Sequence, residues 1–239
     1  MAAGLAALTL AGAAAAQTVS ISTLPPGSVN NVQTQAIAKV VQEQTGMQMR
    51  VIAFNSPQAS MTAVEVGEAQ FSFMSNDEVG VAVRGLDEHE GAPVESLRLV
   101  TTVFPFKVGI VVRADSDIRT VADLRGKRFP VGWDGFPQGI ALSRAMLATA
   151  GLDLGDVQGV PTTNLLRAAG DLKAGVLDAT IFAIGAPKMA ELDAAIGIRF
   201  LDLPNTPEAA AAIAAIRPGI TSHPRSRCPA STGSPTART

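Results

Sequence analysis

Short apolar runs alternate with segments of helical periodicity along most of the chain. Residues 19–23 alternate between apolar and polar side chains, which is the pattern of a half-buried strand. The Pro-Pro-Gly sequence in residues 24–28 then predicts a turn. In the next segment, Val32, Ala36, Ile37, Val40 and Val41 recur at helical spacing until Gly46, so this segment is predicted to be a helix.

The same alternation continues to about residue 216 and predicts an α/β fold with largely parallel sheets. Predicted strands lie at 47–54, 70–74, 97–103, 108–113, 128–131, 157–160 and 179–182, with an extended segment at 199–203. Predicted helices lie at 61–68, 78–83, 138–150, 164–174, 186–195 and 207–216. Residues 84–96 are predicted to form a surface loop.

Ligands of doubly wound sheets bind at the carboxyl ends of strands, where helix N-termini point. We therefore expect the loops that follow a strand and precede a helix to form any binding site. These loops are residues 22–31, 54–60, 74–77, 132–139 and 182–187.

The two ends of the chain differ from this pattern. Residues 1–16, MAAGLAALTLAGAAAA, are apolar and end in the A-x-A pattern of a signal-peptide cleavage site. We expect a signal peptide whose basic n-region is missing, and a buried Ala-rich helix is the alternative. Residues 217–239 are rich in Ser, Thr, Pro and Arg without periodicity, so we expect a disordered tail that arose from a frameshift or a truncated gene.

Composition excludes several classes of function. The formal net charge is −2, and four of the 19 basic residues lie in the tail, so the middle of the chain is acidic and lacks the basic stripe of a nucleic-acid-binding protein. The single Cys excludes an intrachain disulfide framework and a multi-Cys zinc site. With only two His, His89 and His223, we expect no metal site and no cofactor.

Catalytic motifs are absent from the sequence. It contains no G-x-S-x-G, Walker or G-x-G-x-x-G motif. His89 lies in an acidic loop typical of a solvated histidine, and Asp77 and Glu78 stand where acidic residues favour a helix start. We therefore expect a protein that is not an enzyme, with catalysis on the same fold as a minor alternative.

Several motifs in residues 19–203 resemble the TAXI family of solute-binding proteins, the extracytoplasmic receptors of one class of TRAP transporters. The firmest is IVVRADS at 110–116 followed by VADLRGKR at 121–128. The order of Ser22-Thr23, GEAQF at 67–71, SND at 75–77 and FAIGAP at 182–187 is also similar to the TAXI order.

This resemblance implies a two-lobed fold of the periplasmic-binding-protein type (type II), with a hinge and an interlobe cleft. Lobe one would comprise residues 18–105, lobe two residues 106–203, and residues 204–216 would begin the return to lobe one, with the first crossover near 104–107. The resemblance also implies a periplasmic protein that captures a small solute, a carboxylate or an amino acid such as glutamate, for a TRAP transporter membrane subunit. The alternative is a ligand-sensing module for a signalling partner.

The candidate ligand-binding residues follow from the same loops. Backbone N–H groups of Gln138 and Gly139 at a helix start would offer donors to a carboxylate. Three of the candidates have structural alternatives to a binding role. Asn76 would cap a helix, Ser56 would stabilise a turn, and Phe182 would belong to the core. Lys107 and Arg113 are possible charge partners of the solute, and surface solvation is the favoured alternative for Arg113. The full set of expected ligand-binding residues is Ser22, Thr23, Ser28, Asn55, Ser56, Ser75, Asn76, Trp133, Phe136, Gln138, Gly139, Phe182 and Gly185.

Overall fold

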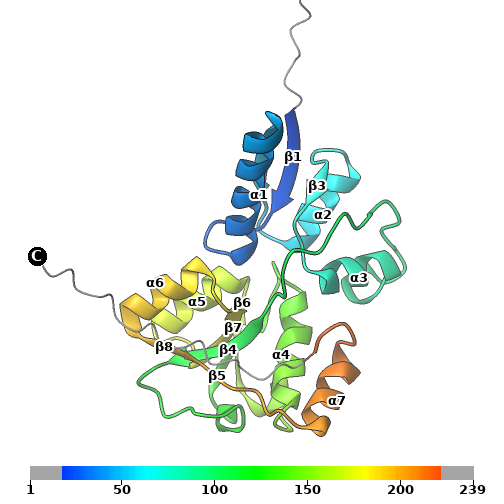
Figure 1. The fold of residues 1–239 in the computed structure, drawn as a ribbon. Helices are drawn as coiled ribbons and strands as arrows, with labels where there is room; N and C mark the ends of the chain where they lie inside the picture. The colour runs from blue at the N-terminus through cyan, green and yellow to red at the C-terminus, as the bar shows by residue number, and fades with distance from the viewer. Residues whose placement is uncertain (1–17, 222–239) are drawn as a thin grey trace, which may run out of the picture.

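The computed structural model describes residues 18–221 and divides them into two α/β lobes (Figure 1). The first lobe contains one parallel three-stranded sheet in the order β2-β1-β3, in which Ile21 of β1 pairs with Val51 and Phe71. Its elements are β1 (Thr18–Thr23), α1 (Val29–Thr45), β2 (Gln48–Ala53), α2 (Pro57–Glu65), β3 (Phe71–Ser72), α3 (Asn76–Arg84) and the 3-10 turn η1 (Asp87–His89).

The second lobe contains a parallel pair of strands, β5-β6, and a three-stranded sheet in the order β7-β4-β8. Its elements are β4 (Val108–Arg113), η2 (Ala122–Leu124), β5 (Arg128–Gly132), α4 (Gln138–Ala148), η3 (Leu154–Asp156), β6 (Gln158–Thr162), α5 (Leu165–Lys173), β7 (Ala179–Ala183), α6 (Pro187–Ile196) and β8 (Ile198–Phe200). Helix α7 (Pro207–Ile216) follows and packs against α4.

The predicted alternation of strands and helices is confirmed, but the expectation of largely parallel sheets needs a correction. Strand β4 pairs antiparallel with both β7 and β8. The reason lies at the crossover: the Ile184 N–H donates to the Lys107 carbonyl over 2.9 Å, so the chain enters β4 beside the end of β7. The start of β4 therefore lies at the same edge as the carboxyl end of β7.

Two differences between the predicted and observed elements have a clear physical reason. Residues 97–103, expected to be a strand, form no strand, and Leu99 and Val100 are 74% and 77% exposed. Their β-branched composition favours a strand, but within residues 18–221 no strand pairs with this segment. Helix α2 begins four residues earlier than expected, because Ser56 caps it by accepting a hydrogen bond from the Ala59 N–H and Pro57 occupies its first turn.

The main hydrophobic core lies in the second lobe, where β4, β5 and β7 pack against α4, α5 and α6. Trp133 is fully buried there, in a turn that holds it at φ +57°. Its ring lies directly beneath Gly139 of α4, because a Cβ built on Gly139 would stand 2.4 Å from the Trp133 Cδ2 atom. Phe136 packs edge-to-face on Trp133, with ring centroids 6.0 Å apart. This stack fixes α4 on the end of β5.

An ion pair joins the two sheets of the second lobe. The Arg128 guanidinium lies 2.5 Å from Asp178 Oδ1, and the Arg128 N–H donates to Asp178 Oδ2 over 2.8 Å. The hydrogen bonds from Arg128 lower the pKa of the Asp178 carboxyl below its usual value. Because Arg128 begins β5 and Asp178 precedes β7, the pair holds these two strands side by side.

The expected domain boundaries stay predictions, and two observations bear on them. The body of α7 packs on α4 of the second lobe rather than on the first lobe. Arg217, at the start of the expected tail, is buried and ion-paired, so the chain is ordered beyond the predicted limit. The expected signal peptide and residues 222–239 lie outside the described residues. Within residues 18–221, no helix has the length and apolar character needed to span a bilayer.

The close contact between Trp133 and Gly139 predicts opposite effects for two glycine substitutions. Gly139→Ala is expected to lower the free energy of unfolding by about 1–3 kcal/mol, because the added methyl group overpacks the ring. Gly170→Ala in α5 is the matched control: its new Cβ meets no atom within 4 Å. A helical Gly→Ala change is then expected to raise that free energy by about 0.5–1 kcal/mol. Urea denaturation measures the unfolding free energy of both variants. Equal changes in the two variants would contradict the close packing of Trp133 against Gly139.

Candidate functional site

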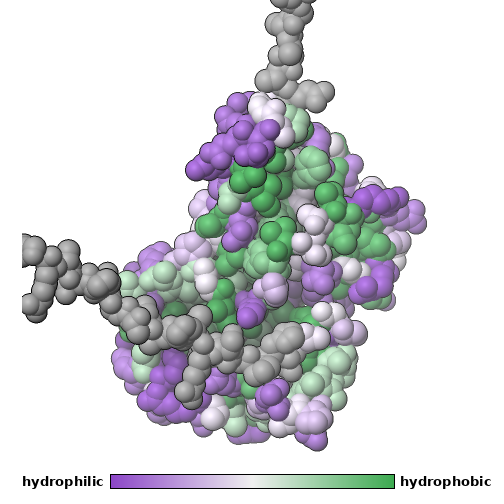
Figure 2. All heavy atoms as spheres, viewed as in Figure 1, coloured by the Kyte–Doolittle hydropathy of each residue, from purple (hydrophilic) through white to green (hydrophobic). Residues whose placement is uncertain are grey.

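A cleft of about 2730 Å³ opens between the lobes and extends over one face of the first lobe. All of the loops expected from the sequence contribute residues to it, for example Ser28, Asn55, Asn76, Gln138 and Phe182. The crossover at 96–109 also lines the cleft, as do residues 200–203 and 219–221. The cleft continues over apolar residues of β1 and α1 in the first lobe, and Figure 2 shows apolar side chains on that lobe and at its junction with the second.

Helices α1, α2 and α3 of the first lobe begin at this cleft, and each is capped by a serine. The Ser28 Oγ accepts from the Asn31 N–H over 3.1 Å, and the Ser56 Oγ accepts from the Ala59 N–H over 3.2 Å. Ser75 forms a capping box, in which its Oγ accepts from the Glu78 N–H while Glu78 Oε2 accepts from the Ser75 N–H. The serine side chains are therefore used locally, and the N-terminal ends of the helices face the cleft.

Helices α4 and α5 of the second lobe also begin at the cleft. Gln138 is the first residue of α4 and is 1% exposed, and Pro137 before it supplies no side-chain cap. Asn164 caps α5 by accepting a hydrogen bond from the Arg167 N–H over 2.9 Å, and both Asn164 and Leu165 line the cleft. Helix starts from both lobes thus converge on one space, and each contributes partial positive charge.

The structure brings about half of the predicted site residues to the cleft and places the others elsewhere. The residues that line the cleft are Ser28, Asn55, Ser75, Asn76, Phe136, Gln138 and Phe182. The residues that do not line it are Ser22, Thr23, Ser56, Trp133, Gly139 and Gly185. The alternative role expected for Asn76, a helix cap, is wrong, because Ser75 is the N-cap residue of α3.

Ser22 and Thr23 are fully buried within the first lobe. The Ser22 Oγ donates to the Ser60 carbonyl over 2.8 Å and accepts from the Ser60 Oγ over 2.8 Å. The Thr23 Oγ1 accepts from the Thr34 Oγ1 over 3.0 Å. These hydroxyls join β1 to α1 and to the start of the α2 helix, so the structure corrects their predicted role as ligand contacts.

Trp133 and Gly139 are a second correction. Trp133 was expected to bind the ligand, but its turn directs the indole under α4 and into the core. The Gly139 N–H was predicted to meet a solute, but it donates to the Phe136 carbonyl over 2.8 Å. Gly185 lies beyond the lining residue Ile184, at φ +85° in the turn before α6.

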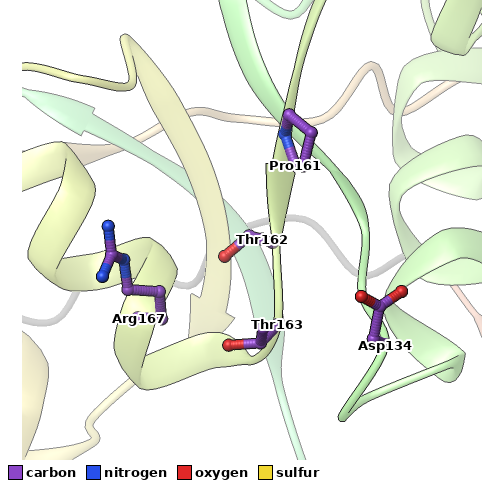
Figure 3. Close-up of a pocket in the computed structure, with 5 residues that line it drawn as sticks. All are labelled: Asp134, Pro161, Thr162, Thr163 and Arg167. Atoms are coloured by element: carbon purple, nitrogen blue, oxygen red, sulfur yellow. The ribbon is translucent and has the colours of Figure 1, made fainter.

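A smaller pocket of about 190 Å³ lies at the carboxyl ends of β5 and β6 (Figure 3). Asp134 comes from the loop before α4, Thr162 and Thr163 from the end of β6, and Arg167 from α5. Thr162 is 4% exposed, and its Oγ1 has no hydrogen-bond partner among the described residues. The Arg167 Nε donates to Asp171 over 3.0 Å. The pocket thus presents a carboxylate, a hydroxyl and a guanidinium beside the residues that line the main cleft.

The loop between β6 and α5 was missed in the sequence. Residues 161–164 stand between a strand and a helix, which is the same arrangement as in the five loops expected to form the site. The signal was therefore present, because polar Thr162, Thr163 and Asn164 follow a strand and the Asn begins a helical pattern.

Charged residues of the cleft differ in how they are paired. Asp77 pairs with Arg217, and the Arg98 Nη1 donates to the Glu95 and Leu97 carbonyls. Lys107 lines the cleft and is exposed, and no ion pair or hydrogen bond holds its ammonium within the described part of the chain. Arg113, the other predicted charge partner, instead binds Asp115 through Nε over 3.1 Å and does not line the cleft. Residues 18–221 hold no group of three or more His, Cys, Asp or Glu arranged to bind a metal ion.

The capping carboxylate of Glu78 gives a prediction for pH dependence. Burial raises the pKa of Glu78 above 4.5, although its hydrogen bonds to Ser75 act in the opposite direction. When the pKa of an acid is higher in the folded chain than in the unfolded chain, the acid contributes to the free energy of unfolding at pH values below its unfolded pKa. This contribution is lost as the pH rises through the folded-state pKa. Relative to the parent chain, Glu78→Gln is therefore expected to gain unfolding free energy as the pH rises above 4.5.

Glu208→Gln is the matched control with the opposite sign. Hydrogen bonds at the start of α7 lower the pKa of Glu208 below 4.5. Glu208 therefore contributes to the free energy of unfolding above that pH, and this contribution is lost on acidification. The Gln variant is expected to lose unfolding free energy, relative to the parent chain, as the pH rises. Urea denaturation from pH 4 to pH 8 measures how the difference in unfolding free energy between each variant and the parent chain changes with pH. If this difference changes in the same direction for both variants, the raised pKa of Glu78 is wrong.

Comparisons with known proteins agree with this geometry. The profile of the NMT1-like family matches residues 21–223. The periplasmic aliphatic sulphonate binding protein SsuA from Escherichia coli superposes with a TM-score of 0.50 at 21% identity, over 77% of this chain and 56% of that chain. An ancestral arginine-binding protein bound to arginine gives a TM-score of 0.52 at 16% identity, over 77% of this chain and 78% of that chain.

A protein described as a periplasmic transporter gives a TM-score of 0.58 at 16% identity, over 80% of this chain and 66% of that chain. These similarities show a two-lobed α/β fold of the periplasmic-binding-protein type, with a cleft between its lobes. The chain spans 56% of the length of the Escherichia coli sulphonate binding protein, little more than half.

Proposed function

Because this chain belongs to the NMT1-like family, we propose that it is a periplasmic solute-binding protein that captures a small anionic solute between its lobes and delivers it to a TRAP-type transporter. The observation that carries the proposal is the convergence of the N-termini of α1 to α5, drawn from both lobes, on one cleft. Such helix ends present N–H donors and partial positive charge, which suit a carboxylate or a sulfonate.

The cleft is larger than the roughly 300–1,000 Å³ of a typical ligand pocket. In the proposed mechanism, the lobes close on the solute and exclude the remaining water. Phe136 and Phe182 supply an apolar wall, and Asn55 and Asn76 supply neutral hydrogen-bonding groups from the first lobe. The smaller pocket with Asp134 and Arg167 would hold a second polar end of the solute, as an amino acid such as glutamate has.

Lys107 is the charged residue that we propose to contact the solute. It stands at the crossover beside Ile184, so closure of the lobes would bring both cleft walls toward its ammonium. The sequence motifs shared with TAXI receptors support a TRAP membrane subunit as the partner. A ligand-sensing module for a signalling partner would use the same cleft, so the bound partner distinguishes the two functions.

Replacement of Lys107 tests the proposed site. Native mass spectrometry of protein purified from cells identifies the retained solute, and calorimetry then measures its affinity, with glutamate as the first compound tried. Lys107→Met is expected to weaken binding roughly ten- to hundredfold, because a hydrogen bond to a charged group contributes about 1.5–3 kcal/mol.

Arg113→Met is the matched control, since Arg113 is bound to Asp115 and lies outside the cleft. It is expected to leave the affinity unchanged. The charge assignment is wrong if Lys107→Met binds as tightly as the parent chain, and the proposed class of function is wrong if the bound compound is chemically converted.

A further inference from the structure

An ion cluster around a buried arginine joins the two lobes on the side of α3 and α7. Arg217 directly follows α7, and it is 2% exposed. Its Nη2 lies 2.9 Å and its Nε 3.2 Å from Asp77 Oδ2, while Nη1 donates to Asp87 Oδ2. One guanidinium therefore holds two carboxylates from different elements of the first lobe.

The partners of Arg217 connect it to both ends of α3 and to α7. Asp77 is the second residue of α3, whose N-terminus lines the cleft, and Asp87 lies in η1 directly after that helix. On the other side, Arg217 is anchored to α7 by the hydrogen bond from its N–H to the Ile213 carbonyl, 2.8 Å long. Because α7 packs on α4, the cluster connects the second lobe to the cleft-facing end of α3.

The acidic residues of the cluster require the positive charge of Arg217 for their stability. Asp77 and Glu78 are adjacent, and the Asp77 charge raises the pKa of Glu78 while the Arg217 charge lowers it. Loss of the guanidinium would leave a largely buried carboxylate unpaired beside another acid, which is far less favourable than loss of an exposed pair.

The opposite side of the interface is held more weakly. There, the Lys188 N–H at the start of α6 donates to the Gly27 carbonyl over 3.2 Å, and Val29 packs against the core of the second lobe. Figure 1 shows α5 and α6 on one side of the molecule and α3 and α7 on the other. The described residues on this side contribute a neutral backbone hydrogen bond and apolar packing, whereas the other side carries an ion cluster, so the interface is asymmetric.

We propose that Arg217 is an interlobe latch: it holds Asp77 and Asp87 of the first lobe against the α4–α7 pair and so sets the angle between the lobes. It is a positioning residue that acts through α3 and does not contact the solute. The latch is a property of the ligand-free chain, so this proposal does not depend on the solute or the transporter proposed above.

The decisive variant is Asp87→Asn. The Asp87 side chain is 52% exposed, and its backbone has φ +49°, a conformation that Asn adopts readily, so this variant keeps the fold while removing one charge from the latch. Asp115→Asn is the matched control: Asp115 also binds an arginine, but that pair is exposed and lies within the second lobe. Arg217→Met removes the whole latch, and Arg217→Lys keeps the charge without the forked donors.

Pulsed electron spin resonance measures the interlobe distance directly. Spin labels are attached through Gln44→Cys in α1 and Lys173→Cys in α5, in a Cys228→Ser background so that only these two sites react. We expect Asp87→Asn to broaden the distance distribution of the parent chain, Arg217→Met to broaden it further, Arg217→Lys to restore part of the narrow distribution, and Asp115→Asn to leave it unchanged.

Circular dichroism of each labelled variant confirms that it is folded. If Arg217→Met does not fold, the comparison of Asp87→Asn with Asp115→Asn decides the question. A distance distribution in Asp87→Asn that matches those of the parent chain and of Asp115→Asn would overturn the latch.

Discussion

The interlobe cleft depends on one constraint of strand pairing: parallel strands end at the same edge of a sheet. In each lobe the loops that leave this edge lead into helices, so the N-termini of α1, α2 and α3 meet those of α4 and α5 across the interlobe space. The antiparallel strand β4 preserves this arrangement, because its start pairs with the end of β7 and brings the crossover with Lys107 to the same edge. The position of the cleft therefore follows from topology.

The same constraint explains why side chains and backbone have different roles at the cleft. The serines that precede α1, α2 and α3 bond to their own helix turns, which stabilises the helix ends and holds them in place. Trp133 supports α4 from below through its contact with Gly139 rather than by lining the space. Much of the recognition we propose thus falls to backbone N–H groups, apolar walls and Lys107, on a scaffold of capped helices. Arg217 adds a connection between that scaffold and the second lobe.

Sequence periodicity predicted the order of most elements, the α/β class and five of the loops that line the cleft, because these features depend on local patterns. It could not assign individual side chains. Ser22 and Ser28 are both polar residues in the same loop region, yet Ser22 bonds to Ser60 from a distant part of the chain and is buried. The strand expected at 97–103 was wrong because a strand requires a partner that local composition does not reveal. The Arg217 cluster joins residues 130 to 140 positions apart, so no local signal marks it.

Amide hydrogen exchange with and without the solute identified from purified protein tests the central claim most directly. The account predicts that the solute slows exchange at the starts of helices in both lobes, near residues 28–31, 75–79, 138–141 and 164–167. Protection confined to one lobe, or protection that spares these helix starts, would contradict the claim that a solute is held between two facing sets of helix N-termini.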